Sequence, residues 1–301
     1  MIKRFAAFGA AAMIALSLVQ GNAAAAAKIE IIVNDKNVSS DVSAYIRQGV
    51  TFVPLNVVGQ IPGSTVKWDN AAKTATVTSG TKTVQLAAGQ KWAVIDGKKT
   101  ALAAAPVLSG GRIMVPLRVI AEASGAYVEW SPATQTVFIG KADSKLLERL
   151  NSENLAEART AAVQLPTIRL VKGFEIDPVS AEGQNLTYYF PEGRADRFFI
   201  AAGDLIYYYE IKSGVSREVW TAKLDPLTKK GEGALPFIQS KALAQEGKKP
   251  AVSGRFAFFH VMPHIGEAQY GFVEADGTET QLGQREMNFG TIIGIEGEQK
   301  L

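Results

Sequence analysis

Residues 51–58 read Thr-Phe-Val-Pro-Leu-Asn-Val-Val, and residues 113–120 read Ile-Met-Val-Pro-Leu-Arg-Val-Ile, at an offset of 62 positions. The correspondence runs without a gap from 51–78 to 113–140. Nine of these 28 paired positions are identical, whereas average residue usage gives roughly two matches by chance. The pattern indicates one supersecondary unit that occurs twice.

The repeat also extends toward the N-terminus. Residues 32–36, Ile-Val-Asn-Asp-Lys, match residues 94–98, Val-Ile-Asp-Gly-Lys, at the same offset. We therefore predict copies at about 29–79 and 91–140, which together form one domain over residues 28–140. Such repeats are typical of scaffolds, because the matching residues are those that direct folding.

Each copy carries the same order of signals for secondary structure. A short apolar run ends at Pro54 or Pro116, and helical spacing follows as far as Gly63 or Gly125. Proline suits the start of a helix because its missing N–H would have no partner there, and glycine suits a left-handed exit. Alternating segments on both sides of a four-residue turn then predict a β-hairpin. The expected fold class is α+β, with a pseudo-repeat domain of antiparallel sheet and two short helices.

Two further turns are expected in this domain. Asp96-Gly97 is the strongest short hairpin signal between the copies. Ser109-Gly110-Gly111-Arg112 contains two glycines, but it lacks the spacing of a phosphate-binding loop. It therefore predicts a turn that leads into the core strand of the second copy.

Residues 1–27 have the features of a secretory signal peptide. Lys3 and Arg4 precede an apolar run over 5–19, and small residues suitable for cleavage follow at 23–27. The run is shorter than the roughly 20 residues that span a bilayer, so we expect cleavage rather than a membrane anchor. The chain has no cysteine, so no disulfide or lipidated cysteine is expected. The predicted product is secreted and has no transmembrane segment after the signal is removed.

The charge of the mature chain is nearly balanced. Removing Lys3 and Arg4 from 32 basic residues leaves 30, against 29 acidic residues, so nucleic acid is not an expected partner. Residues 28–140 carry 11 basic and 7 acidic residues, and residues 141–301 carry 19 and 22. A solvated surface explains this mild asymmetry as well as a polyanionic partner does.

The pattern changes after residue 140. Residues 144–165 show an apolar stripe among charged residues, which predicts a helix that Pro166 ends. We therefore expect a helical linker over 141–165, followed by a β-rich domain over 166–301. Short apolar segments between Gly, Pro and Asp turns are typical of a mostly antiparallel sandwich or barrel. The expected strands cover 167–176, 186–190, 197–201, 205–211, 215–222, 255–262, 269–274 and 278–282. The stretch 225–250 is rich in Lys, Gly and Pro and predicts a long loop.

The two Val-Pro-Leu segments, each followed by a glycine, a Val-x-Trp strand and a Thr-containing strand, resemble the copper amine oxidase N-terminal domain-like family, or stalk domain. The resemblance covers residues 28–140. The second copy carries the fuller pattern with Arg118 and Glu122, where the first copy has Asn56 and Gln60. Residues 141–301 resemble no family that we can name.

The resemblance implies a non-catalytic projecting module of exported bacterial proteins, often at the cell surface. It does not imply copper chemistry. Such an oxidase holds copper with three histidines and makes its quinone cofactor from a tyrosine in a Thr-x-x-Asn-Tyr-Asp/Glu context. This chain has two histidines in all, and none of its tyrosines has that context. No cofactor is therefore expected.

The two histidines, His260 and His264, are four residues apart, a spacing that on a helix would suggest a metal site. Pro263 lies between them and excludes that geometry. Their setting is the end of an apolar strand, so we favour packing or surface roles and predict no metal site.

Candidate catalytic residues are restricted to carboxylates, since the chain has no thiol and no Gly-x-Ser-x-Gly elbow. Glu175 with Asp177, or Asp204 with Glu210, could form an acid/base pair of the kind that glycosidases use. Acids at such spacing on a strand are more often a solvated face. We therefore predict no catalytic residues.

Aromatic residues cluster at 188–190, 198–199 and 207–209. Exposed tyrosine rows can stack on sugars or contact a partner, but burial on both faces of a sheet explains the same pattern and is favoured. Trp68 and Trp130 occupy the same position of the two copies and are expected in the core.

The sequence therefore favours a secreted, non-enzymatic protein of the cell surface or cell wall. The repeat domain would serve as a spacer or attachment module, and the β-rich domain would bind a cell-wall glycan or another exported protein. The alternative is an extracellular carboxylate-dependent hydrolase that uses the repeat domain as a targeting appendage. A sensor or inhibitor module, with a large exposed aromatic patch, is a third interpretation.

Overall fold

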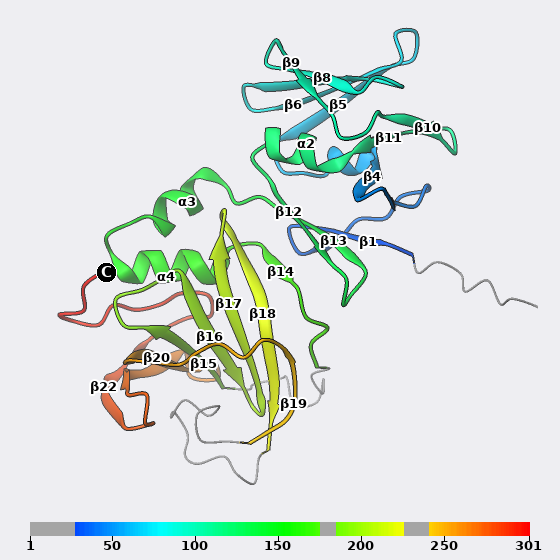
Figure 1. Ribbon diagram of the computed structural model, residues 1–301. Helices are drawn as coiled ribbons and strands as arrows, with labels where there is room; N and C mark the ends of the chain where they lie inside the picture. Colours follow the sequence, from blue (N-terminus) through cyan, green and yellow to red (C-terminus); the bar gives the residue numbers. More distant parts are fainter. Residues whose placement is uncertain (1–27, 175–184, 226–240) are drawn as a thin grey trace, which may run out of the picture.

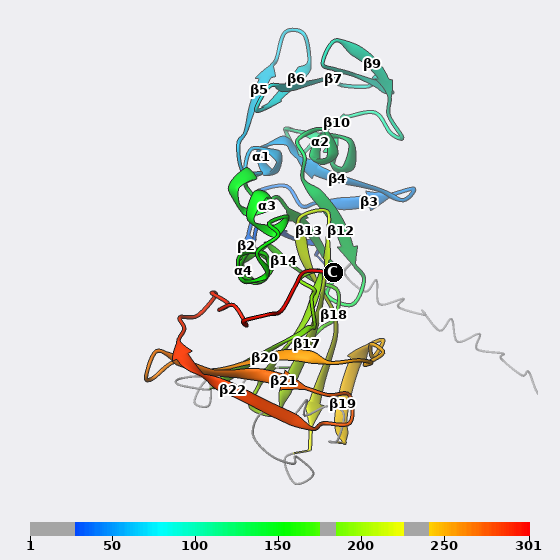
Figure 2. The same ribbon diagram turned by 90° about the vertical axis from the view of Figure 1, so that its left-hand side faces the viewer.

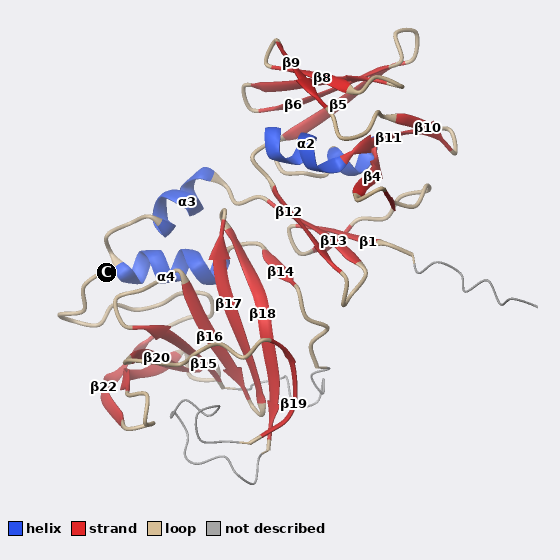
Figure 3. Cartoon of the chain, viewed as in Figure 1, coloured by secondary structure: helices blue, strands red, loops and turns tan. Residues whose placement is uncertain are grey.

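The computed structural model describes residues 28–174, 185–225 and 241–301, so the predicted signal peptide lies outside the described residues. These residues form mostly strands, together with four helices (Figures 1 and 3). Nearly all strand pairings are antiparallel, and the described parallel ones are β1 with β13 and β14 with β18. The prediction of a mostly antiparallel, β-rich chain is therefore confirmed.

A four-stranded sheet lies at the centre of the repeat region, in the order β10-β11-β4-β3. Its strands are β3 (Tyr45–Arg47), β4 (Val50–Pro54), β10 (Val107–Ser109) and β11 (Arg112–Pro116). Val53 lies opposite Val115, while Pro54 pairs with Met114 and Pro116 with Phe52. Exchanging the two copies leaves this register unchanged, because Met114 is the offset-62 partner of Phe52. An approximate twofold axis therefore passes between Val53 and Val115.

Two further sheets combine strands of both copies (Figure 2). One has the order β12-β13-β1-β2 and contains β1 (Glu30–Val33), β2 (Lys36–Asn37), β12 (Tyr127–Ser131) and β13 (Thr136–Gly140). The other contains, in sequence order, β5 (Ser64–Asp69), β6 (Thr74–Ser79), β7 (Lys82–Ala87), β8 (Trp92–Ile95) and β9 (Lys98–Ala101). In the first sheet the hairpin that follows α2 pairs directly with the hairpin that begins the first copy, through β13 and β1. In the second sheet β7, which lies between the copies, connects the hairpin that follows α1 to the hairpin that begins the second copy. Neither copy therefore forms its sheets alone.

The short helices α1 (Leu55–Val58) and α2 (Leu117–Ala123) start directly after Pro54 and Pro116. Their apolar sides join the sheets in one buried cluster that includes Leu55, Val57, Val77, Leu117, Ile120 and Val137. Asp96 and Gly97 have φ values of 49° and 81° in the hairpin between β8 and β9, which is the turn geometry that Asp-Gly favours. Residues 109–112 form the predicted turn between β10 and β11.

The single helix predicted over 144–165 is wrong, because the segment forms two helices, α3 (Ser144–Leu150) and α4 (Leu155–Gln164). The Asn151 side chain donates to the Leu147 carbonyl at 2.9 Å, next to the end of α3. The Asn154 side chain accepts from the Ala156 and Glu157 amides and caps the start of α4. These two asparagines satisfy helix ends and divide the segment.

The described residues of the C-terminal half form one nine-stranded sheet, in the order β14-β18-β17-β16-β15-β20-β21-β22, with β19 also paired to β18. Its strands are β14 (Thr167–Arg169), β15 (Leu186–Pro191), β16 (Arg197–Ala202), β17 (Leu205–Lys212), β18 (Val215–Leu224), β19 (Ala242–Gly247), β20 (Phe256–Met262), β21 (Glu267–Val273) and β22 (Glu279–Glu286). The sheet is open and curls on itself, so that Trp220 of β18 and Phe258 of β20 share one core (Figure 2). It is one curled sheet rather than the expected two-sheet sandwich or closed barrel.

The central strands β15, β16 and β20 are buried on both faces of this sheet. Tyr189, Phe199 and Tyr208 belong to the core on the inner face. Tyr188 and Phe190 belong to the core on the other face, beneath α4 and the segment 287–301. The favoured interpretation of the aromatic clusters, burial on both faces, is therefore confirmed for these side chains.

Two expected segments differ from the structure. The strand predicted over 167–176 ends at Arg169, and residues 175–176 lie outside the described ranges. Within the predicted loop 225–250, β19 pairs with β18 in the register Trp220 opposite Gly247. Pairing with the long strand β18 gives β19 its backbone partners, although the β19 side chains are mostly exposed.

Candidate functional site

The histidines do not come together as metal ligands. His260 lies on β20, with its Nδ1 2.8 Å from the Thr187 hydroxyl, and His264 is exposed in the turn that follows. Across the described residues, no three His, Asp or Glu side chains form a group that could hold a metal ion. The domain over 28–140 contains no histidine, so its residues do not fit a copper ion.

The predicted carboxylate pairs also do not form a catalytic site. Glu175 and Asp177 lie outside the described residues. Asp204 directly precedes β17 and Glu210 lies near the other end of that strand; Asp204 is 3.7 Å from Lys223, and Glu210 is 3.8 Å from Arg217. Six residues along a strand span about 20 Å, whereas two-carboxylate hydrolysis needs about 5–10 Å.

Sequence reasoning missed the buried carboxyl group of Glu218, whose side chain is only 4% exposed. Burial raises its pKa to about 7, while the charge of Arg169 and the Tyr209 hydroxyl act in the opposite direction. A register shift near Tyr208 places Glu218 opposite Tyr209, a pairing that the sequence alone does not indicate. Among the described residues, the groups that affect the pKa of Glu218 are Arg169 and Tyr209, and neither is a carboxylate.

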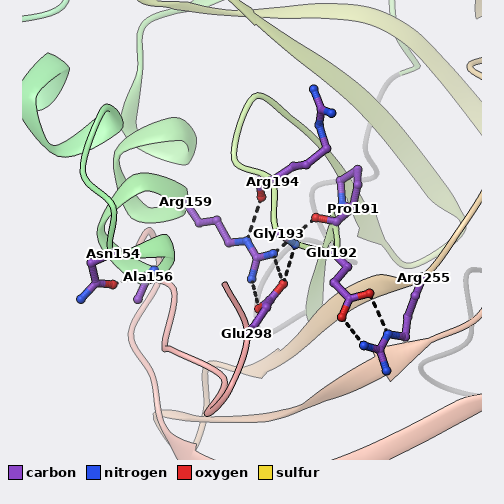
Figure 4. A network of polar contacts seen from close by, with 9 residues as sticks. All are labelled: Asn154, Ala156, Arg159, Pro191, Glu192, Gly193, Arg194, Arg255 and Glu298. Atoms are coloured by element: carbon purple, nitrogen blue, oxygen red, sulfur yellow. Dashed lines mark hydrogen bonds and ion pairs between the residues drawn. The ribbon is translucent and has the colours of Figure 1, made fainter. Parts of the chain in front are cut away.

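A buried ion pair joins α4 to the C-terminal segment (Figure 4). Arg159 donates to both carboxylate oxygens of Glu298 at 2.7 and 2.5 Å, and these side chains are 1% and 2% exposed. Arg159 also donates to the Arg194 carbonyl at 3.0 Å, and the Gly193 amide donates to Glu298 at 2.9 Å. The protein itself supplies these partners, so the pair fixes the C-terminal segment and leaves little capacity for a ligand.

The two halves of the chain meet in a compact junction. Phe138, Ile168 and Val215 form a buried cluster with members from both halves. Beside it, Arg217 donates to both oxygens of Glu129 at 2.7 and 2.6 Å. Such bidentate pairs fix orientation as well as distance, so the junction holds β13 and β18 in a defined arrangement.

Two grooves lie beside the repeated tryptophans. The Trp130 groove, about 210 Å³, is lined by α2, by β12 and by residues 49–51 of the other copy. The Trp68 groove, about 500 Å³, is lined by α1, by β5 and by residues 111–113. Seven of the nine residues that line the Trp68 groove have their offset-62 partner in the Trp130 groove. The grooves are therefore equivalent positions of the repeat.

Both tryptophans are only partly buried, so the expectation that they are core residues is wrong in part. Each packs on the core of the repeat domain and also lines a groove. The strand pattern correctly places them toward the core, but it does not show that strand exchange leaves a groove beside each ring.

Over residues 28–140 the duplicated strands are arranged around an approximate twofold axis, and each copy carries a groove beside its tryptophan. Residues 32–139 match the family described as the copper amine oxidase N-terminal domain, which confirms the resemblance predicted for this region. No curated protein matches the chain. Among the described residues, no helix has the length and apolarity to cross a membrane.

Proposed function

We propose that the chain is a secreted, non-enzymatic protein of the cell surface or cell wall. In this proposal the repeat domain is a spacer or attachment module, and the β-rich domain binds a partner. The partner would be a cell-wall glycan or another exported protein. The family match over residues 32–139 supports the spacer role.

The junction is the observation that carries this proposal. A spacer needs a fixed connection to the domain that it presents, and Phe138 of the repeat region packs directly on Ile168 and Val215. A hydrogen bond between the two halves reinforces the packing, since the Thr167 amide donates to the Asp35 carboxylate at 3.1 Å. The repeat domain would therefore hold the β-rich domain in one orientation.

A sedimentation assay tests the proposal. The mature chain is mixed with purified cell-wall material at several salt concentrations, and the bound fraction is measured after centrifugation. We expect retention with wall material and no release of soluble sugar fragments from it. Recovery of the chain in the soluble fraction alone, with no exported protein captured by cross-linking, would contradict the proposal.

The buried carboxyl of Glu218 favours the alternative, an extracellular carboxylate-dependent hydrolase. A pKa of about 7 suits a general acid, although such a site needs a second carboxylate. This alternative predicts release of soluble fragments from the wall material and loss of that release in Glu218→Gln. Binding without release supports the non-enzymatic proposal.

A further inference from the structure

The two grooves are equivalent in position but differ in their charged groups. In the Trp68 groove, Arg112 is held by Asp41, with donor–acceptor distances of 2.9 and 2.6 Å from its Nε and Nη2 atoms. In the Trp130 groove, Arg118 and Glu122 line the cavity one helical turn apart on α2. Neither of these two side chains has a hydrogen bond or ion pair to another described residue, and both are exposed.

The repeat provides an internal comparison for this difference. The offset-62 partners of Arg118 and Glu122 are Asn56 and Gln60, which are neutral. The folding role of the helix is shared by both copies, so it does not require charge at these positions. The charged pair is therefore specific to the Trp130 groove.

The groove combines three recognition elements. The partly exposed indole of Trp130 provides an apolar surface for the C–H face of a ring. The Arg118 guanidinium presents the planar fork that matches a carboxylate, and the Glu122 carboxylate accepts from hydroxyl or amide N–H groups. A volume of about 210 Å³ is below the roughly 300–1,000 Å³ of drug-sized sites, so it suits one ring-sized unit.

We propose that the Trp130 groove binds an acidic amino sugar, such as one unit of an anionic cell-wall glycan. The sugar ring lies on Trp130, its carboxylate pairs with Arg118, and its hydroxyl or acetamido N–H donates to Glu122. This inference rests on the proposed function, and it adds a ligand class and a site in the repeat domain. It therefore assigns wall recognition to the repeat domain as well as to the β-rich domain.

The test follows the indole N–H signals of the full mature chain by ¹H–¹⁵N NMR. The chain has four tryptophans, and Trp130→Phe assigns the relevant signal. The probes are N-acetylmuramic acid and N-acetylglucosamine, which share a ring and differ in the lactyl carboxylate. We expect a saturable shift of the Trp130 signal with the acidic sugar and binding at least about fivefold weaker with the neutral one.

Variants on the exposed face of α2 test the roles without altering the core. Arg118→Gln is expected to weaken binding of the acidic sugar about tenfold, because it removes a charge-assisted pair. Arg118→Lys, which keeps the charge but not the fork, should be intermediate. Glu122→Gln should weaken binding of both sugars. Asn56→Ala and Gln60→Ala are the matched controls in the other copy and should bind as the unaltered chain does.

Equal binding of the two sugars, unchanged binding in Arg118→Gln, or a shift at Trp68 instead of Trp130 would overturn the inference. Tighter binding of an acetylated tripeptide with a free carboxylate would also overturn it and would indicate a peptide site. These results are separate from the sedimentation assay. If Arg118→Gln sediments with wall material as the unaltered chain does, the Trp130 groove is not the site of wall binding, and the proposed function still stands.

Discussion

Glu218 is the residue with the clearest link between position and solution behaviour. Its pKa is raised by burial from an ordinary value of 4.5 to about 7. The folded chain therefore keeps this proton over a range of pH in which the unfolded chain has released it. The free energy of unfolding therefore decreases as pH rises from about 4.5 to 7. Above pH 7 the buried carboxyl is ionised, and the full destabilisation remains.

Glu218→Gln should stabilise the chain at pH 8 by up to about 3 kcal/mol, since a pKa unit corresponds to about 1.4 kcal/mol. At pH 5 the effect should be much smaller, because Glu218 is then largely protonated in the folded chain. Urea denaturation at both pH values measures the difference. Glu286→Gln, at an exposed position on β22, is the control and should change stability equally at the two pH values. An equal effect of Glu218→Gln at both pH values would count against a raised pKa.

At the scale of elements, a buried ion pair, apolar packing and hydrogen bonds together hold the C-terminal segment. Glu298→Ala leaves Arg159 charged and buried over the rings of Phe190 and Phe259. Removing one partner of such a pair should lower the free energy of unfolding by about 3–5 kcal/mol. Urea denaturation measures the loss, and amide exchange at Ile292, which donates to Thr160, reports release of the segment.

An exposed pair of the same chemistry provides the comparison. Arg255 and Glu192 are bonded near the same turn, but both are solvated. Glu192→Ala should therefore lower the free energy of unfolding by less than about 1 kcal/mol. The double variant Arg159→Met with Glu298→Leu should regain much of the lost stability. Similar losses of unfolding free energy in Glu298→Ala and Glu192→Ala would show that burial does not determine how much the Arg159–Glu298 pair contributes to stability.

Some elements follow from local sequence signals, and others depend on contacts that the sequence does not reveal. Proline and glycine positions predict the two short helices and the turn at Asp96-Gly97, because these residues restrict or permit backbone angles locally. The division between α3 and α4 depends on side-chain caps at Asn151 and Asn154, which an apolar stripe does not reveal. The strand β19 and the burial of Glu218 depend on pairing between distant segments. The Trp130 groove forms where strands of the two copies combine. The sequence therefore identifies residues that line it but does not predict the groove itself.

At the scale of the whole molecule, the junction determines whether the repeat domain can act as a spacer. Gly140 at the end of β13 lies against the other half, and a Cβ atom there would be 2.4 Å from Val215 Cγ1 and 3.6 Å from Pro166 Cβ. Gly140 does not have a positive φ, so the constraint is packing rather than backbone geometry. The close approach fits two halves that are held together without a flexible link at this point.

Gly140→Ala should open or distort the junction and cost about 1–3 kcal/mol, because overpacking forces the neighbours apart. Since the chain has no cysteine, spin labels at Lys98→Cys and Gln281→Cys report the distance between the halves. We expect one narrow distance distribution without the glycine substitution and a broader or shifted one with Gly140→Ala. Gly294→Ala, where the nearest atom would be 3.8 Å away, is the control and should leave the distribution narrow.

Glu129→Ala provides a milder test if Gly140→Ala folds poorly, because it removes the ion pair to Arg217 and leaves the apolar cluster. A broad distribution before any substitution would contradict a rigid spacer, because the repeat domain would then not fix the orientation of the β-rich domain.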